Sequence, residues 1–287
     1  MDMRFVVIGD LHGQMPNVYY GNLDLLLSVG DFCANISNLR EMMFKEISEK
    51  MKNPKITTHW YDMMGRSNAR KALQQLFSEG RKALEKLNSF GLPAYVVPGN
   101  WDQTPEDSQW AYLKSDHFRG LTKGLKNIIN VHEKRVDIGE YQLIGYGVSS
   151  GPEIPRHKED LAVISKKALA KRKQYYKTEY AKLSRLFDGA TKPVLFLTHN
   201  VPFGTSIDQI NNKDSPRNGY HYGSLIVRDL VEKYKPVLAI GGHMHEHFAS
   251  AHLGKTTCIN AGFGGMRNVL VELYGEKVLN TEFYEKP

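Results

Sequence analysis

Two histidines follow an apolar run after a pair of glycines, and this arrangement restricts how the chain can fold. Residues 236–240 are apolar, and two glycines lead from them into His243-Met244-His245. Side chains two residues apart on a strand point to the same face, so both imidazole rings can converge on one point. The glycines let the backbone turn sharply there. The pattern predicts a strand whose end presents a pair of metal ligands.

Further apolar runs end in residues of the same kinds. Residues 5–8 lead into Asp10 and His12, and residues 194–197 lead into His199. Four of the strand-end residues have a glycine immediately before them. The complete set is Asp10, His12, Asp31, Asn100, His199, His243 and His245. Several strands that deliver such side chains at their ends indicate the rim of a sheet around a metal site.

The number and chemistry of these seven residues favour a site for two metal ions. Borderline divalent metals accept mixed shells of imidazole and carboxylate, and seven ligands exceed the closed four-coordinate shell of one ion. Two ions about 3.5–4 Å apart could share a bridging carboxylate, clamp an anionic ester and generate hydroxide at neutral pH. We expect manganese, with iron, zinc, nickel and cobalt as alternatives.

The composition is that of an ordinary globular protein. Of its 287 residues, 41% are hydrophobic and 24% charged. No apolar stretch approaches the ~20 residues of a membrane span, and the N-terminus runs straight into a strand, which leaves no room for a signal peptide. The two cysteines, Cys33 and Cys258, give no indication of a disulfide framework or a cysteine-based zinc site. We expect both to be reduced and buried, in a cytoplasmic protein without membrane association.

The net charge of +7 is concentrated in one segment. Residues 156–185 contain ten lysines or arginines against three acidic residues, so this segment accounts for the whole excess. The sequence thus predicts one basic element rather than a generally basic protein.

The apolar runs fall into two groups that indicate an α/β fold. In the first, residues 5–8, 25–29 and 94–97 are separated by helical periodicity, which predicts a parallel sheet covered by helices. The second starts near residue 128 with short runs and tight turns, as in an antiparallel meander. Its members are residues 128–131, 136–138, 142–144, 194–197, 237–240, 247–251, 256–259, 269–273 and 277–283, with a hairpin turn at Tyr274-Gly275-Glu276.

Three long segments stand between these strands. Residues 36–90 are expected to be mostly helical, and residues 157–187 to form one amphipathic basic helix. Residues 203–223 are rich in Gly, Asn, Asp, Ser and Pro, and are expected to form a loop. With no internal repeat and no clear linker, we expect a single domain, residues 1–287, with two helical insertions.

Taken in order, the motifs resemble those of the calcineurin-like metallophosphoesterases. They are Gly9-Asp10-Leu11-His12-Gly13, Gly30-Asp31, Gly99-Asn100, Thr198-His199 and Gly242-His243-Met244-His245. The resemblance implies an α/β fold, a four-layer αββα sandwich with two mixed sheets. It also implies the ligand set: a first metal on Asp10, His12 and His245, a second on Asn100, His199 and His243, and Asp31 as the bridge.

One position departs from the commonest pattern of the family. Many members have a histidine after the motif asparagine, whereas this chain has Trp101, whose indole is no useful proton donor. The departure resembles a prokaryotic branch of small phosphoesterases that also lacks this histidine. His221 is the expected general acid, and Arg217 and His117 are weaker candidates. The missing histidine mildly favours esters with good leaving groups.

The resemblance implies a dimetal-dependent phosphoesterase that hydrolyses a phosphate ester by in-line attack of a metal-bound hydroxide. Asp31 would hold the two ions together, and Asn100 and His199 would orient the second. We expect a phosphodiester or an activated monoester as substrate, with nucleotides the natural class. The oligomeric state is left open.

Two alternative functions share this fold. A nuclease would use the basic helix of residues 157–185 to bind nucleic acid, with Tyr175, Tyr176 and Tyr180 available for base stacking. Its binding would weaken strongly with salt. A catalytically silent binding scaffold would need none of the ligands, yet all seven positions hold competent ones. The phosphoesterase interpretation is therefore favoured over both alternatives.

Overall fold

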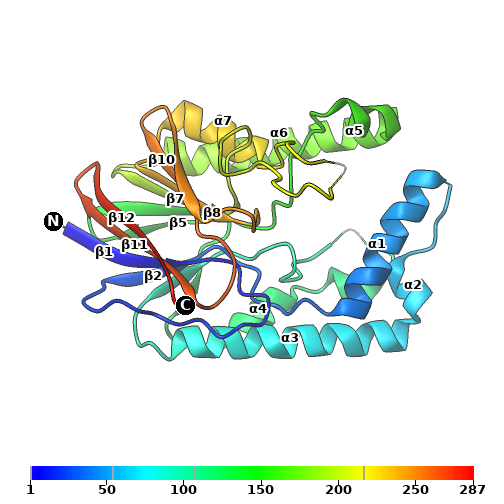
Figure 1. Cartoon of the computed structure of the whole chain (residues 1–287), viewed down its shortest axis with the longest axis horizontal. Helices are drawn as coiled ribbons and strands as arrows, with labels where there is room; N and C mark the ends of the chain where they lie inside the picture. The colour runs from blue at the N-terminus through cyan, green and yellow to red at the C-terminus, as the bar shows by residue number, and fades with distance from the viewer. Residues whose placement is uncertain (1, 54, 107, 216) are drawn as a thin grey trace.

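Two six-stranded sheets pack face to face in a computed structural model, and helices cover the outer face of each (Figure 1). The structure describes residues 2–53, 55–106, 108–215 and 217–287. Three clusters of buried apolar side chains separate the four layers: one between the sheets, and one beneath the helices on either side. The predicted α/β fold, a four-layer αββα sandwich with two mixed sheets, is confirmed.

The first sheet is mixed, with four parallel strands. Its strands, in spatial order, are β12 (Lys277–Glu285), β11 (Arg267–Tyr274), β1 (Asp2–Ile8), β2 (Leu25–Ser28), β3 (Ala94–Val96) and β4 (Ile128–Asn130). Strands β1 to β4 run parallel, whereas β11 is antiparallel to both of its neighbours. The carboxyl ends of β1, β2 and β3 therefore lie at one edge.

The second sheet has a parallel centre and antiparallel edges. Its strands, in spatial order, are β5 (Arg135–Ile138), β6 (Tyr141–Tyr146), β7 (Val194–Asn200), β8 (Leu238–Gly242), β10 (Thr256–Asn260) and β9 (Ala249–Leu253). Strands β6, β7, β8 and β10 run parallel, and the edge strands β5 and β9 pair antiparallel. Because β7 and β8 run parallel, the loops that follow them leave from a common edge of the sheet.

Three strands belong to a different sheet from the one that the sequence predicts. The sequence groups residues 128–131, 269–273 and 277–283 with the antiparallel second set, but β4, β11 and β12 complete the first sheet. The segment between β3 and β4 contains a helix and is long enough for a parallel crossover. Strand β11 returns from the second sheet to pair with β1. That part of the prediction is wrong.

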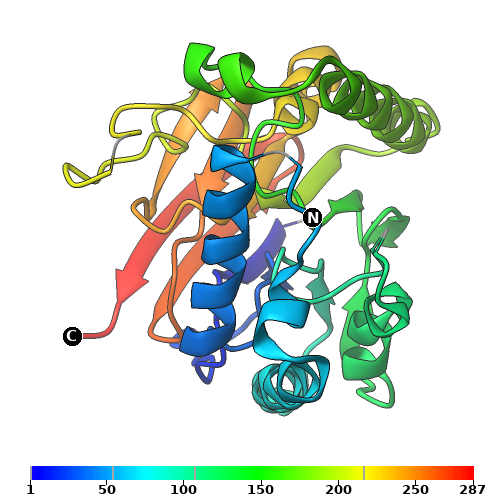
Figure 2. The ribbon, with the colours of Figure 1, turned by 90° about the vertical axis from the view of Figure 1, so that its right-hand side faces the viewer.

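Helices cover both sheets. They are α1 (Ser37–Lys52), α2 (Trp60–Met64), α3 (Arg66–Asn88), α4 (His117–Thr122), α5 (Lys158–Val163), α6 (Lys166–Asp188) and α7 (Leu225–Tyr234), with a short 3-10 helix at Ala111–Lys114. Figure 2 shows α3 below the sheets and α6 above them. The mostly helical character of residues 36–90 is confirmed, because three helices occupy most of this segment. The described part of residues 203–223 forms a loop, as predicted.

The basic segment is two helices rather than one. Helix α5 ends at Val163, Ile164 is extended, and α6 begins at Lys166. The Ser165 side chain caps α6 by accepting a hydrogen bond from the Ala168 backbone N–H at 3.2 Å. Such a cap satisfies a backbone donor that has no partner within the helix. The prediction of one continuous helix over residues 157–187 is therefore wrong.

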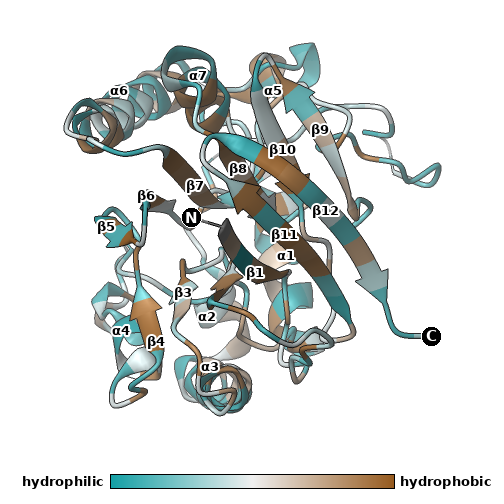
Figure 3. Cartoon of the chain, turned by 90° about the vertical axis from the view of Figure 1, so that its left-hand side faces the viewer, coloured by the Kyte–Doolittle hydropathy of each residue, from teal (hydrophilic) through white to brown (hydrophobic). Residues whose placement is uncertain are grey.

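Apolar side chains follow the layers. Figure 3 shows hydrophobic colour along β1, β8 and β11, and hydrophilic colour on outward surfaces of α3 and α6. Cys33 and Cys258 are buried and form no disulfide, as predicted. Among the described residues, no helix is both long and apolar enough to cross a membrane.

Candidate metal centre

The seven strand-end residues meet at one end of the sandwich. Strands β1 and β8 each deliver two of them, and β2, β3 and β7 deliver one each. Contacts among them connect all seven, directly or through one another. They are Asp10, His12, Asp31, Asn100, His199, His243 and His245. The structure thus brings together every residue that the motifs single out as a ligand.

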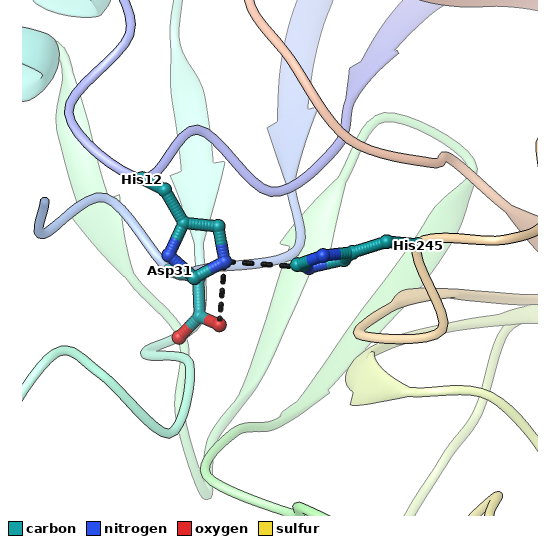
Figure 4. A group of neighbouring side chains, drawn as sticks. All are labelled: His12, Asp31 and His245. Carbon is teal, nitrogen blue, oxygen red and sulfur yellow. Dashed lines mark hydrogen bonds and ion pairs between the residues drawn. The ribbon is translucent and has the colours of Figure 1, made fainter. Parts of the chain in front are cut away.

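His12, Asp31 and His245 form the first cluster of ligand atoms (Figure 4). The Nε2 atoms of the two rings lie 3.3 Å apart, and His12 Nε2 lies 3.4 Å from Asp31 Oδ2. His245 Nε2 lies 3.2 Å from Asp10 Oδ2. Burial lowers the pKa of His12 to about 4, so near neutral pH its ring is uncharged and offers a lone pair.

Asp31, His199 and His243 form the second cluster. His199 Nδ1 lies 2.9 Å from the Val29 carbonyl oxygen, and its Nε2 lies 2.8 Å from Asn100 Oδ1. Burial lowers the pKa of His199 to about 4, so the ring carries one proton while both nitrogens face an oxygen. With the proton on Nδ1 donated to Val29, the Nε2 lone pair faces the amide oxygen with no proton between them. A cation at that point would satisfy both atoms.

Asp31 belongs to both clusters. Its Oδ1 accepts a hydrogen bond from the Trp101 backbone N–H at 2.8 Å. Its Oδ2 faces His12 Nε2 at 3.4 Å and His199 Nε2 at 3.6 Å. Burial, and then the neighbouring carboxylates, raise the pKa of Asp31 well above its usual range. Positive charge beside Oδ2 would stabilise the ionised form, as expected of a ligand shared by two ions.

Asp10 is fully buried, and one of its oxygens lacks a hydrogen bond. Its Oδ2 accepts a hydrogen bond from the His243 backbone N–H at 2.5 Å, whereas Oδ1 has no such partner among the described residues. A buried carboxylate oxygen in this position is costly unless a cation lies nearby. The carboxylates, neutral imidazoles and amide oxygen together fit divalent metal ions.

The backbone is left-handed at three of the ligands. The φ angle is 44° at His12, 51° at Asp31 and 66° at His243. Residues other than glycine rarely adopt positive φ, and such strain gathers at functional sites. Gly99 shows why glycines accompany these ligands: a Cβ there would lie 2.0 Å from Asp31 Oδ1. The glycine lets one backbone segment pass directly against a ligand of another.

Two residues that the sequence does not single out support the centre. Asp102 is fully buried and accepts hydrogen bonds from the backbone N–H groups of Cys33 (3.0 Å) and Gly99 (2.8 Å), which ties together the loops after β2 and β3. Phe263 stacks on the His245 ring, with centroids 4.8 Å apart. The sequence does carry a signal for Asp102, because this carboxylate stands two residues after the motif residue Asn100. Phe263 comes from a distant segment, and its neighbours in the sequence carry no such signal.

The candidates for a general acid lie outside the seven ligands. His221 Nδ1 lies 2.7 Å from Oδ1 of the fully buried Asp208. Arg217 forms an ion pair with Asp160, and His117 hydrogen bonds to a backbone carbonyl. Within the described part of the chain, no side-chain contact joins these three candidates to the ligands.

The loop that carries His221 is nevertheless fastened beside the ligands. Asn200, which follows a ligand on β7, donates a hydrogen bond to the Tyr222 carbonyl oxygen at 3.0 Å. His247, two residues after the last ligand, lies with its Nε2 2.6 Å from the Gln209 carbonyl oxygen. Gln209 in turn forms an isolated bridge with His221. The loop is therefore held at the end of the molecule where the ligands meet.

A family model described as calcineurin-like phosphoesterase matches residues 3–247, which is most of the chain. The matched range contains all seven strand-end residues. No curated protein matches the chain in sequence.

Solved structures resemble the chain over almost its whole length. One crystal structure is 16% identical, covers 99% of both chains and has a TM-score of 0.65. The protein TT1561 of Thermus thermophilus is 14% identical, with 99% of both chains covered and a TM-score of 0.52. A Staphylococcus aureus protein assigned as a 5′-nucleotidase, in complex with alpha-ketoglutarate, is 13% identical; the match covers 99% of this chain and 54% of that one, with a TM-score of 0.50. At these identities the likeness shows the fold alone.

Proposed function

Because this chain belongs to the calcineurin-like phosphoesterase family, we propose that it hydrolyses phosphate esters with two divalent metal ions bound side by side. The observation that carries the proposal is the position of Asp31, which belongs to both ligand clusters. A carboxylate shared in this way suits two ions about 3.5–4 Å apart. Manganese is the metal we propose, with iron, zinc, nickel and cobalt as alternatives.

The two clusters divide the ligands between the ions. The first ion would be held by Asp10, His12 and His245, the second by Asn100, His199 and His243, and both by Asp31. When bound, the ions supply the Lewis acidity that activates water and neutralises charge on the phosphoryl oxygens.

The contribution of the protein is to hold the ligands in place. The Val29 carbonyl oxygen orients the His199 ring through Nδ1 and leaves Nε2 for the metal. The Trp101 backbone N–H holds Asp31 Oδ1, so that Oδ2 stays turned toward both clusters. Hydrogen bonds of this kind fix the orientation of metal ligands and raise their affinity.

His221 is the residue that we propose as proton donor to the leaving group. Trp101 cannot take this role, since an indole is no useful acid. The buried Asp208 holds His221 Nδ1 at 2.7 Å, which leaves Nε2 for the substrate, and the His221 side chain is 35% exposed. A histidine oriented by a carboxylate is a common general acid. Arg217 is already engaged by Asp160 and is the poorer candidate.

The substrate that we propose is a phosphodiester or an activated monoester, with nucleotides as the expected class. A ring-bearing anionic substrate would agree with the 5′-nucleotidase assignment of one structural neighbour. An ester with a good leaving group would need the least help from a general acid.

Hydrolysis of bis-p-nitrophenyl phosphate and p-nitrophenyl phosphate by metal-stripped protein tests the proposal. Each ester is assayed with Mn, Ni, Co, Zn and Mg, for the wild type, Asp31→Ala and the control Asp137→Ala, whose side chain is 61% exposed. We expect metal-dependent turnover that falls about 10³-fold or more in Asp31→Ala, since metal ions contribute several kcal/mol of transition-state stabilisation. Asp137→Ala should match the wild type. Turnover that is independent of metal, or unchanged in Asp31→Ala, would overturn the proposal.

A further inference from the structure

A pocket of about 640 Å³ opens beside the metal centre. Its walls come from the segment after β6, from α5 and α6, and from the loop of residues 203–223. Figure 1 shows α5 and α6 together above the second sheet. The volume lies within the range of about 300–1,000 Å³ that is typical of small-molecule sites.

The pocket wall is bonded directly to the ligand-bearing segments. Ser150 lines the pocket, and its backbone lies near the His243 ring. Val148 also lines it, and its N–H donates to the Pro98 carbonyl oxygen at 2.8 Å, two residues before Asn100. These contacts place the pocket wall against the segments that carry Asn100 and His243.

The wall is firmly built. Glu153 is buried, and its carboxylate accepts hydrogen bonds from the Ser149 hydroxyl (3.0 Å), the Ser224 hydroxyl (2.6 Å) and the Leu225 backbone N–H (2.8 Å). These bonds fasten the segment after β6 to the start of α7. Val148 adopts a φ of 61°, which a β-branched residue rarely does.

The charged side chains that line the pocket are Lys171, Arg172 and Arg217 against Glu153 and Asp160, so the cations exceed the carboxylates by one. Asp160 is engaged by the Arg217 guanidinium and by the Tyr222 hydroxyl at 2.9 Å. Glu153 is occupied by the hydrogen bonds just described. Arg172, on the first turns of α6, is exposed and lines the pocket. The pocket therefore favours an anionic group, and Arg172 is the cation best placed to receive it.

Aromatic and apolar side chains make up much of the remaining lining. Tyr175 on α6 is 45% exposed, and its hydroxyl lies 3.4 Å from that of the buried Tyr146. The Tyr222 ring is covered by the Arg217 guanidinium at 5.1 Å, and Val163 of α5 is exposed. An exposed tyrosine face beside an apolar wall offers a stacking place for a planar ring.

We propose that this pocket binds the part of the substrate beyond the scissile phosphate, and that this part is a nucleotide-like group with a planar ring and a further anionic charge. The inference rests on the proposed function for the placement of the phosphoryl group. It gives the basic segment around α6 a local role, in which Arg172 and Tyr175 select a small molecule.

Isothermal titration of manganese-loaded protein, with unbound metal removed, tests the pocket. The probes are α,β-methylene ADP, which resists hydrolysis, and methylenediphosphonate, which has the same two anionic groups without the nucleoside. We expect α,β-methylene ADP to bind at least about tenfold tighter than methylenediphosphonate. Ring stacking together with apolar contacts contributes more binding free energy than a tenfold change in Kd requires. Equal affinities would overturn the proposal.

Variants of α6 locate the contacts. Arg172→Gln should weaken α,β-methylene ADP binding about tenfold, the effect of losing a charge-assisted hydrogen bond. Lys173→Gln removes the same charge from the next position, which does not line the pocket, and should change nothing. Tyr175→Ala should also weaken binding, whereas Tyr274→Ala, at a distant exposed tyrosine, should not. Equal losses in Arg172→Gln and Lys173→Gln would mean general electrostatic attraction and would overturn the proposal.

The pocket and the proposed function can fail separately. Binding of α,β-methylene ADP is measured on metal-loaded and metal-free protein, whereas turnover of p-nitrophenyl phosphate reports the chemistry. Arg172-dependent binding without turnover would reject the proposed function and keep the pocket. Turnover with equal affinity for the two probes would keep the proposed function and reject the pocket.

Discussion

The metal centre and the pocket beside α6 are built in opposite ways. Asp10, Asp31 and His199 are essentially buried and are held by backbone groups of the strand-end loops, whereas Arg172 and Tyr175 stand exposed on a helix. Buried ligands are fixed before a substrate arrives, but long exposed side chains lose conformational entropy when they are ordered by it. On the proposed function, the rigid strand ends would serve the chemistry, and the exposed side chains of α6 would serve selectivity.

His221 stands on the loop between these two regions, and among variants that keep all seven ligands its replacement should give the largest effect. His221→Ala should lower kcat for phenyl phosphate, which has a poor leaving group, by about 10²-fold, as expected for loss of a general acid. With p-nitrophenyl phosphate the loss should be small, because that leaving group needs little protonation. Steady-state kinetics on both esters measures the difference, with the exposed His252→Ala as control. An equal fall in kcat on the two esters would contradict the role as general acid and would show that His221 only stabilises the loop.

Asp102 tests whether the centre depends on its backbone supports. In Asp102→Asn the amide nitrogen would face a backbone N–H, because both carboxylate oxygens now accept such groups. We expect the free energy of unfolding to fall by about 1–3 kcal/mol and metal affinity to fall about tenfold. Urea unfolding and metal titration measure the two effects, with the exposed Asp137→Asn as control. Unchanged metal affinity would show that the loops hold their ligands without this link.

Replacement of Ser165 should give the smallest effect, and it tests whether α6 and the metal centre are independent of each other. Ser165→Ala removes the cap of α6 and should lower the free energy of unfolding by about 1 kcal/mol. Metal affinity should stay as in the wild type, because α6 supplies no ligand. Thermal unfolding and metal titration measure both quantities, and Ser250→Ala on β9 is the exposed control. A fall in metal affinity would show that the centre and the inserted helix are coupled.

The convergence of the ligands was predictable because the signal is local. Asp10 and His12 directly follow an apolar strand, and the spacing of His243 and His245 repeats that pattern on a second strand. Parallel strands then deliver such ends to one edge without further information. The positive φ angle of Asp31 and the packing of Phe263 on His245 were not predictable, since both arise from loops that meet only in the folded chain.

Sheet membership and the pocket depend on contacts between distant segments. Residues 128–130 are a short apolar run that could pair on either sheet, and only the crossover through α4 places them beside β3. The break at Ile164 lies in a pattern that stays amphipathic on both sides, and a serine such as Ser165 is common on helix surfaces. The pocket joins the stretch from β6 to α6 with a loop that follows β7, so periodicity gave no sign of it.

Electron paramagnetic resonance of the manganese-loaded protein, with metal content measured on the same sample, tests the central claim that Asp31 joins two ions. We predict two manganese ions per chain and a spectrum of exchange-coupled ions, with the coupling lost in Asp31→Ala. One ion per chain, or two ions without coupling in the wild type, would contradict the account.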